Sequence, residues 1–452
     1  MRLEEIVEGG LRGGAAAVLG AKATSVNFRF ANNTVTTNGR EESTSVGMVA
    51  LEQGRVGVQT GDVIESSQVT ELAREARARA QESPEAPDAV PMLSPAEAAS
   101  PEALDPGVPP EALPQDLEPI LDSVRQVLEQ SREAGLRCFG FAWADAVQEQ
   151  LGTVTGVRLE GRRQHASVAL TLKTSDLRRS VWAGSTARRL ADIDPTALYR
   201  GLLQRLSWTE SSVTLPAGHY QVLLEPSATS DLIVRLMWEM HARGADEGRT
   251  VFAGKSGPRV GEAMYASEVS LESDPLDPQM LVPNFVRCLG SSEYGSVFDN
   301  GLAIPVAVWV KGGVQQDLIC PRSWAQSHGH PVRPDVENLA MRGTDTSLEQ
   351  MIATTERGLL VTSLWYIRDV DPATLLLTGL TRDGVFLIER GEVVGAVNNF
   401  RFNESPVGVL QRTVEIGRSE MALSREVGDS FFIKAPPIRV ENFFMSSVSD
   451  AI

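Results

Sequence analysis

The sequence is poor in cysteine and in long apolar runs, and both scarcities exclude classes of protein. Its three cysteines, Cys138, Cys288 and Cys320, are widely spaced and predict neither a disulfide framework nor a zinc ribbon. The longest apolar run, residues 302–310, is far too short to span a bilayer. The N-terminus, MRLEEIVEGG, has acids where a signal peptide needs positive charge. We therefore expect a soluble, cytoplasmic protein.

Positive charge is scarce as well. The chain has 42 Lys and Arg against 59 Asp and Glu, for a net charge of -17. Because a surface that binds nucleic acid needs clustered Lys and Arg, this balance argues against that class of protein. Apolar residues make up 42% and charged residues 22% of the chain, as in ordinary globular proteins. At 452 residues the chain is long enough for two or three domains.

A strand followed by a helix is predicted between residues 215 and 262. The apolar run 220–224 is typical of a half-buried strand. After Glu225-Pro226, Ser227, Thr229 or Ser230 can cap a helix, with Asp231 favourable in its first turn. The apolar stripe of this helix comprises Leu232, Ile233, Leu236, Met237 and Met240. Gly244 and Gly248 are expected to end it.

The first 83 residues predict a mixed domain of helices and strands. A helix is expected over residues 1–24, and alternating apolar residues between 25 and 62 indicate strands. Turns are expected at Asn32-Asn33 and at Glu52-Gln53-Gly54. A second helix is predicted over residues 68–83. Residues 84–119, rich in Pro, Ala and Glu, are then expected to be an extended, solvated linker.

A second domain is predicted over residues 120–212. It opens with a helix over 117–135 and closes with one over 195–206. The strands expected between them are 138–143, 148–153, 157–160 and 167–174. Trp182-Ala183-Gly184-Ser185 is interpreted as a glycine-bearing turn, and His165 as an exposed side chain.

Residues 213–452 predict a large, mostly β domain that contains the central helix. Asp299-Asn300-Gly301, Lys311-Gly312-Gly313 and Arg390-Gly391 indicate turns. Ser347 is expected to cap a short helix, with Gln350 completing a capping box. The fold class predicted for the whole chain is therefore α+β, with a mixed αβ domain first, a strand-rich αβ domain second and the β-rich domain last.

Several stretches, taken in order, resemble one known family. They are FRFANNTVTTNGREESTSVGMVALEQGRVGVQTGD, which includes Gly47 and Gly57, then DPLDPQMLVPNFVRCLGSSEYGSVFDNGLAIPVAVWVKGG, and finally DGVFLIERGEVVGAVNNFRFNESPVGVLQRTVEIG. With the central helix, they are similar to the TldD/PmbA family, long described as modulators of DNA gyrase. The resemblance covers nearly the whole chain. It rests on the order and spacing of several motifs, and the acidic charge gives no support to DNA binding.

Catalytic TldD-type members of this family resemble metallopeptidases with HExxxH on the central helix. Two histidines from one helix can hold a metal, and the adjacent Glu can act as base. Here the only His expected on that helix is His241. As the second His, it would need His and Glu where the chain has Leu236 and Met237. As the first, it is followed by Ala242 in place of Glu, and Asp246 lies beyond Gly244.

The resemblance also implies a Cys as the third metal ligand, shortly before the closing hairpin. Residues 377–384 contain no Cys, and Arg382 or Asp383 falls near the expected position. Two parts of the family's site are therefore absent together. The chain is identified as a PmbA-like, or TldE-like, member that lacks the HExxxH site. We assign no residue of this chain to a catalytic, cofactor or metal site.

The resemblance implies a role beside a metal-bearing partner. PmbA/TldE-like members resemble subunits that pair with a TldD-type chain, which would hold the zinc. We expect a heterodimer, with a homodimer as the alternative, that holds a peptide as an extended strand. The family roles are cleavage of unfolded peptides and trimming of leader peptides from ribosomally made natural products. A non-catalytic peptide-binding module is a further alternative.

A relocated metal site would make this chain a peptidase in its own right. His328 and His330 could chelate a metal if the chain were extended there, with Asp335 or Glu337 as third ligand and His241 as another candidate. Gly329 and Pro331 indicate a turn instead. This hypothesis stays open at the level of the sequence.

Two weaker patterns predict ordinary turns. Ser291 or Ser292 with His241 would be a serine nucleophile and its base, but no G-x-S-x-G elbow is present. The stretch AGKSG, residues 253–257, lacks the spacing and the following helix of a phosphate-binding loop.

Overall fold

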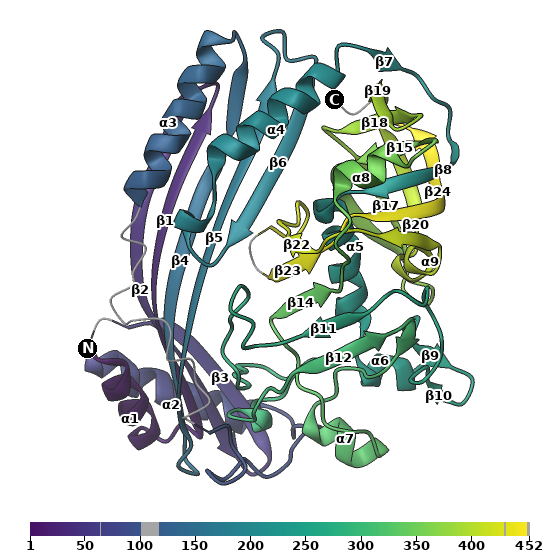
Figure 1. Cartoon of the computed structure of the whole chain (residues 1–452). Helices are drawn as coiled ribbons and strands as arrows, with labels where there is room; N and C mark the ends of the chain where they lie inside the picture. The colour runs from purple at the N-terminus through teal and green to yellow at the C-terminus, as the bar shows by residue number, and fades with distance from the viewer. Residues whose placement is uncertain (64, 101–116, 429–430, 450–452) are drawn as a thin grey trace.

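A long six-stranded antiparallel sheet forms the N-terminal part of the molecule (Figure 1). The computed structural model describes residues 1–63, 65–100, 117–428 and 431–449. The strand order is β3-β2-β1-β4-β5-β6. These strands are β1 (Ala17–Ala31), β2 (Thr34–Glu52), β3 (Arg55–Asp62), β4 (Arg137–Thr153), β5 (Arg158–Lys173) and β6 (Ser180–Ala187).

Residues of both predicted N-terminal domains contribute to this one sheet. β1 pairs with β4 without a break from Ala17–Thr153 to Phe30–Gly140. The strands expected separately within 138–153 and within 157–174 are each one long strand, β4 and β5. The predicted domain boundaries at residues 83 and 120 therefore fall between strands of a single sheet. The strands before residue 83 and those after residue 120 join where β1 pairs with β4.

The helices cover one face of this sheet, because alternate residues of a strand point to the same side. Val18 packs with α1 and α2 at one end of β1, and Val26 and Phe28 pack under α3 and α4 at the other. Ala17, on the opposite face, packs against Phe298 of the C-terminal region. These helices are α1 (Leu3–Arg12), α2 (Ser66–Glu82), α3 (Leu117–Glu133) and α4 (Pro195–Trp208).

Two predictions of secondary structure in this region are wrong. The helix expected over 1–24 ends at Arg12, because Gly13 and Gly14 follow and Gly14 has φ 98°. Residues 182–185 lie in β6 and form no turn. A Cβ at Gly184 would lie 2.6 Å from Cδ2 of Leu423, because the C-terminal region approaches β6 closely at this position.

His165 is buried, contrary to the prediction of an exposed side chain. It is 2% exposed, because β5 turns this residue toward the C-terminal region. Its Nε2 lies 2.8 Å from Thr186 Oγ1, and its ring packs 4.2 Å from that of Phe432.

The segment after α2 packs onto the C-terminal region within residues 85–100. Leu93 and Ala99 are 3% and 4% exposed, and Ser296 Oγ donates to Asp88 at 2.6 Å. The expected solvated linker is therefore packed in this part. Residues 101–116 of the predicted linker lie outside the described residues.

Two further sheets form the C-terminal part. A mixed ten-stranded sheet has the order β16-β17-β20-β24-β8-β15-β18-β19-β7, with β21 paired to β24. Its strands are β7 (Ser212–Val213), β8 (Gly218–Leu224), β15 (Arg357–Val361), β16 (Leu364–Asp371), β17 (Leu376–Thr381), β18 (Val385–Glu389), β19 (Glu392–Val397), β20 (Phe400–Glu404), β21 (Thr413–Ile416) and β24 (Ile438–Val448). The second, six-stranded sheet comprises β11 (Leu271–Ser273), β12 (Ala307–Lys311), β13 (Val314–Gln315), β14 (Asn338–Met341), β22 (Glu420–Met421) and β23 (Phe432–Ala435).

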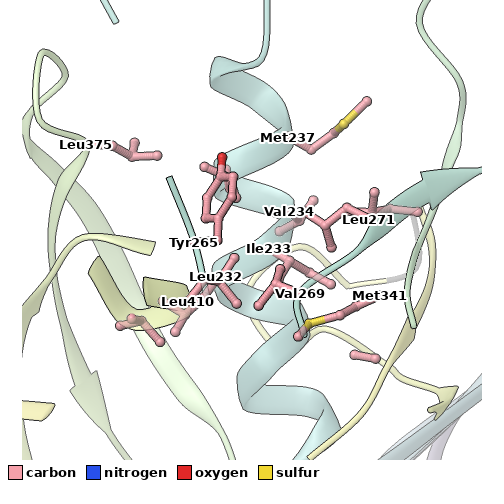
Figure 2. Packing of buried hydrophobic residues seen from close by; sticks show 14 of the residues in the cluster. Leu232, Ile233, Val234, Met237, Tyr265, Val269, Leu271, Met341, Leu375 and Leu410 are labelled. Carbon is pink, nitrogen blue, oxygen red and sulfur yellow. The ribbon is translucent and has the colours of Figure 1, made fainter. Parts of the chain in front are cut away.

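The central helix, α5 (Pro226–Glu239), packs among these sheets. Figure 2 shows Leu232, Ile233, Val234 and Met237 surrounded by side chains from other elements of the C-terminal part. The remaining elements are short: α6 (Ala242–Asp246), α7 (Arg322–His328), α8 (Leu348–Ala353), α9 (Pro406–Gln411) and the hairpin of β9 (Ala253–Gly254) and β10 (Gly257–Pro258). The α+β class and the β-rich domain with a central helix are confirmed. No helix in the described ranges is long and apolar enough to cross a membrane.

The predicted turn chemistry is confirmed at several places. Asn32 and Asn33 have φ 58° and 62°, and Gln53 and Gly54 have φ 52° and 78°, as a tight hairpin turn requires. The Ser347–Gln350 capping box is present on α8. The stretch 253–257 forms the β9–β10 hairpin.

Candidate functional site

The central helix begins earlier in the chain than any of the three predicted caps would allow. Glu225 is its N-cap and Pro226 its first residue, so Ser227, Thr229 and Ser230 lie inside the helix and do not cap it. Proline is favoured at this position, because its missing N–H would have no partner there. Asp231 consequently lies beyond the first turn, and it is fully buried.

The helix also ends earlier, before the histidine that the HExxxH comparison depends on. α5 stops at Glu239, and His241 is the N-cap of α6, where its Nδ1 accepts from Gly244 N at 3.1 Å. The prediction that His241 lies on the central helix is therefore wrong. Leu236 and Met237 are core side chains. Burial lowers the pKa of His241, which favours the neutral ring that this hydrogen bond requires.

The end of β17 holds the second position of interest. Asp383, at φ 55°, follows this strand and is 8% exposed. Its carboxylate forms an ion pair with Arg425 and lies 3.6 Å from Arg382 Nε. Burial alone would raise the pKa of Asp383, but the Arg425 charge and its hydrogen bond outweigh it, so the pKa lies below its usual value.

A single loop joins the two positions. Ser424 Oγ and Glu426 N donate to Asp231 Oδ1 at 2.6 and 3.1 Å, while Arg425, between them in sequence, binds Asp383. We call Asp231, Ser424, Arg425 and Asp383 the Arg425 network. The central helix and the end of β17, the two places where the family resemblance implies metal ligands, are thus joined here by polar contacts of residues 424–426.

Each carboxylate of the network has protein donors. Leu364 N is a third donor to Asp231 and lies 3.4 Å from its Oδ2. Burial nevertheless raises the pKa of Asp231 to about 7, since these hydrogen bonds offset only part of the desolvation. Arg425 also donates to Ser363 Oγ at 3.0 Å, and its guanidinium lies 5.0 Å from the ring centre of Trp182 in β6. The network therefore connects both parts of the molecule.

Glu426 extends these contacts to the edge strand β16. Its carboxylate accepts from Tyr366 N at 2.8 Å and from Ile367 N at 3.1 Å. Arg368 Nη1 donates to it at 3.1 Å, and Arg235 Nη2 of α5 lies 3.6 Å away. The 424–426 loop is thus fixed to α5, to β16 and to the end of β17.

The donor set at this place does not fit a zinc ion. A catalytic zinc takes three protein ligands from His, Cys, Asp or Glu and keeps a position open. Here the two carboxylates are bonded to protein donors, and a guanidinium lies beside Asp383. Across the described ranges, no three His, Cys, Asp or Glu side chains are grouped so that they could hold a metal ion.

His328 and His330, the other two histidines considered as metal ligands, have different contacts in the structure. His328 ends α7 and stacks on Trp324 at 3.8 Å, and Gly329 turns the chain at φ 74°. His330 Nε2 lies 2.8 Å from Asp246 Oδ2. The two imidazoles are parallel, with ring centres 6.4 Å apart.

The expected third ligands have other surroundings. Glu337 forms an ion pair with Arg287, and burial, reinforced by the charge of Glu337, raises the pKa of Asp335 to about 7. His330 lines a cavity of about 340 Å³ together with Cys320 and Arg333.

The serines proposed as nucleophiles stabilise turns. Ser291 Oγ accepts from Val297 N at 3.3 Å, and Ser292 Oγ accepts from Tyr294 N at 3.1 Å. The side chain next to the His241 ring is that of Tyr294, and the two ring centres lie 5.3 Å apart. These contacts give the serines a structural explanation.

Sequence reasoning missed Ser424, Arg425 and Glu426. They follow Asp383 by more than 40 residues, and no local periodicity or turn pattern marks them. Arg382 and Asp383 are singled out from the sequence, but Arg425, the arginine that pairs with Asp383, is not.

These features define a class, namely a β-rich domain built around one buried helix, with an arginine–carboxylate network at the places where the family resemblance implies metal ligands. Residues 217–447 match the sequence model of the PmbA/TldA metallopeptidase C-terminal domain. The chain belongs to the PmbA/TldD family. No curated protein matches its sequence.

Solved structures show the same fold over nearly the whole chain. TldE from Thermococcus kodakarensis is 17% identical, with a TM-score of 0.81, and the match covers 98% of this chain and 99% of that one. A candidate modulator of a DNA gyrase from Thermotoga maritima MSB8 is 16% identical, with a TM-score of 0.77 and 98% of both chains covered. A similarly described protein from Bacteroides thetaiotaomicron VPI-5482 is 14% identical, with a TM-score of 0.76, covering 99% of this chain and 98% of that one.

Proposed function

We propose that this chain is the non-metal, TldE-like subunit of a TldD/TldE-type metallopeptidase complex. In this proposal a TldD-type partner holds the zinc and performs hydrolysis in the cytoplasm, and the two chains form a heterodimer. The substrates are unfolded peptides or the leader peptides of ribosomally made natural products, held as extended strands by main-chain hydrogen bonds.

The Arg425 network is the observation that supports this proposal most strongly. A guanidinium cannot be deprotonated in a protein and cannot act as a metal ligand. Arg425 neutralises Asp383, while Ser424, Glu426 and Leu364 supply the hydrogen bonds to Asp231. The place where a metal-bearing relative would activate water is therefore filled by groups that stabilise one another.

Reconstitution with a TldD-type chain tests the proposal. Peptide hydrolysis is measured for this chain alone, for the partner alone and for the mixture, with an unstructured peptide as substrate. We expect no hydrolysis by this chain alone and hydrolysis by the mixture. Activity of the isolated chain, after contaminating metalloproteases have been excluded, would refute the subunit role. A mixture that binds peptide without cleaving it would favour the peptide-binding module instead.

The relocated-metal alternative has its own test. His330 Nε2 lies 2.8 Å from Asp246 Oδ2, but in the described residues no third His, Cys, Asp or Glu joins them in a group that could hold a metal ion. If a metal sat at His328 and His330, His330→Ala would remove both the bound metal and any activity of this chain. We expect this variant to leave the metal content of the purified chain unchanged.

A further inference from the structure

The first half of β5 has a neighbouring strand on one side only. β4 pairs with β5 from Arg158 to Lys173, whereas β6, on the other side, pairs only with residues 166–173. In the described part of the chain, no strand pairs with that other side of residues 158–161, which we call the β5 edge. An unpaired strand edge is a template for pairing with a further strand.

Two residues of the β5 edge direct their main-chain groups away from β4. At the far end of β5, Thr174 N donates to Arg179 O on the β6 side at 3.1 Å, and just before β5, Val157 O accepts from the last residue of β4 at 3.0 Å. These directions alternate along an antiparallel strand, and neither register of β5 contains a shift. The N–H and C=O groups of Arg158 and Glu160 therefore point to the open side.

A cavity of about 530 Å³ borders the β5 edge, within the range of roughly 300–1,000 Å³ that is usual for ligand sites. On one face of the sheet its wall is α1, since Arg158 Nε donates to Glu8 Oε1 at 2.7 Å. On the other face its wall is the segment 276–284, since a Cβ at Gly161 would lie 2.9 Å from Cβ of Pro283. A strand added to the β5 edge would lie in this cavity, between the two walls.

The wall toward α1 carries an excess of negative charge. Its charged groups are three carboxylates and two guanidinium groups, those of Glu4, Glu8, Glu160, Arg158 and Arg162. Ion pairs join Glu8 to Arg158 and Glu160 to Arg162. The third carboxylate, that of Glu4, lies 3.7 Å from Arg2, which does not line the cavity. A basic side chain on this face would therefore meet a complementary charge.

The opposite wall is mainly apolar. Leu276, Val282 and Pro283 line it, and Leu276 is 46% exposed although its side chain is large and apolar. An apolar side chain that enters the cavity on this face would cover part of that exposed surface.

We propose that the β5 edge binds a short extended peptide segment whose central residue is basic and whose two neighbours are apolar. The segment runs antiparallel to β5, because it takes the place that β6 would occupy if β6 continued beyond Ala187. Directly opposed residues have their side chains on the same face. The basic residue opposes Glu160 and faces α1, and its neighbours oppose Leu159 and Gly161 and face the apolar wall.

The next residues of the segment oppose Arg158 and Arg162. Like charges directly opposed destabilise a strand pair, so these two positions take uncharged residues. A capped pentapeptide Thr-Leu-Lys-Leu-Thr has the required pattern. The site is separate from the Arg425 network, and it does not depend on the proposed function.

Binding of this pentapeptide to the full-length chain tests the pairing, with fluorescence anisotropy of the labelled peptide as the measurement. In the proposed register the Lys directs its N–H and C=O toward Glu160, whereas each Leu directs these groups away from β5. N-methylation of the Lys nitrogen removes one hydrogen bond and should weaken binding about tenfold. N-methylation of a Leu nitrogen gives an isomer of the same composition and charge, and it should change binding by less than about twofold.

Two substitutions in the protein locate the site. Leu276→Ser removes apolar surface from the cavity wall and should weaken binding by roughly threefold to tenfold. Val414→Ser is the matched control, because Val414 is 59% exposed on β21 and does not line the cavity. It should leave binding unchanged, and both variants should melt like the wild type, since both positions are exposed.

Four results would overturn the proposal. They are equal binding of the two N-methyl isomers, equal binding by Leu276→Ser and Val414→Ser, binding that is as tight when Glu replaces the central Lys of the peptide, and no saturable binding of the pentapeptide at millimolar concentrations. Equal binding of the isomers together with loss of binding in salt would indicate attraction by charge alone, without strand pairing.

Discussion

Arg425 explains at the scale of single residues how the carboxylate of Asp383 stays charged although it is buried at the end of β17. Its side chain is 12% exposed and that of Asp383 is 5% exposed. A buried charge that loses its partner is costly, whereas a buried pair replaced by neutral groups costs much less. The stability of this region should therefore depend on the pair, and not on either residue alone.

A double-mutant cycle tests this dependence. Arg425→Met leaves Asp383 buried without its counter-charge and should lower the free energy of unfolding by about 3–5 kcal/mol. Adding Asp383→Asn should recover at least half of that loss, and Asn tolerates the positive φ at this position. The free energies come from urea unfolding near pH 7. Arg401→Met, an exposed arginine on β20, serves as control and should change stability by less than about 0.5 kcal/mol. An Arg425→Met variant as stable as this control would contradict the account.

Asp335 gives a pH-dependent prediction at the same scale. Burial and the charge of Glu337 raise its pKa from 3.8 to about 7, so the folded state holds this proton at pH values where the unfolded chain has lost it. Its contribution to stability is complete below about pH 4 and is lost as the pH rises through 7. Asp335→Asn stays neutral. The variant should gain stability relative to wild type between pH 4 and pH 8, by at most about 4 kcal/mol.

Urea unfolding at several pH values measures that difference. Asp122→Asn is the matched control, because the Asp122 side chain is 76% exposed and pairs with Arg125 on its own helix. Its difference from wild type should stay flat over the same range. A flat difference for Asp335→Asn would mean that Asp335 titrates like an exposed carboxyl.

Residue roles could be predicted from the sequence only where the signal is local. Asn32-Asn33 and the Ser347–Gln350 box have the predicted conformations, because turn and cap preferences are set by adjacent residues. The burial of His165 and the contacts of Arg425 depend on residues far away in the chain, and no neighbouring residue signals them.

At the scale of elements, close backbone approach determines how α2 lies on the sheet. A Cβ placed on Gly57 of β3 would lie 2.0 Å from Ala76 O and 2.3 Å from Ala80 N of α2. Neither backbone atom can move without shifting the helix. The sequence marked Gly57 through the family resemblance, and the contact supplies the physical reason for glycine there.

Two glycine-to-alanine substitutions test this contact. Gly57→Ala should force α2 away from β3 and lower the free energy of unfolding by roughly 3 kcal/mol or more, as overpacking against an unyielding backbone does. Gly201→Ala, on α4, meets no atom within 4 Å and should raise it by about 0.5–1 kcal/mol, because glycine is a poor helix former. Thermal melts of both variants measure the effects, and equal changes in the two would contradict the contact described here.

Element types were predicted better than element ends. Periodicity identified α2, α4, β8 and α5, but the ends of α1 and α5 were wrong. Glycines end α1 earlier than the apolar pattern suggests, since that pattern continues into β1. Pro226 starts α5 earlier than the serines and threonine predicted to cap it.

At the scale of the whole molecule, the sheet that spans both predicted N-terminal domains could not be inferred from local patterns. β1 and β4 are separated by more than 100 residues, and either hairpin alone would satisfy the same alternation. The pattern of expected helices and strands predicted the fold class, whereas the pairing of the two hairpins is a long-range contact. That sheet carries Trp182, against which Arg425 lies, so the candidate site depends on both parts of the chain.

The central claim is that this chain holds no catalytic metal of its own and acts beside a chain that does. Elemental analysis of the purified chain, alone and copurified with a TldD-type partner, tests it most directly. The account predicts no stoichiometric zinc in the isolated chain and about one zinc per pair, because one TldD-type site holds one ion. One zinc per isolated chain would contradict the account, and His328 and His330 would then be the first residues to substitute.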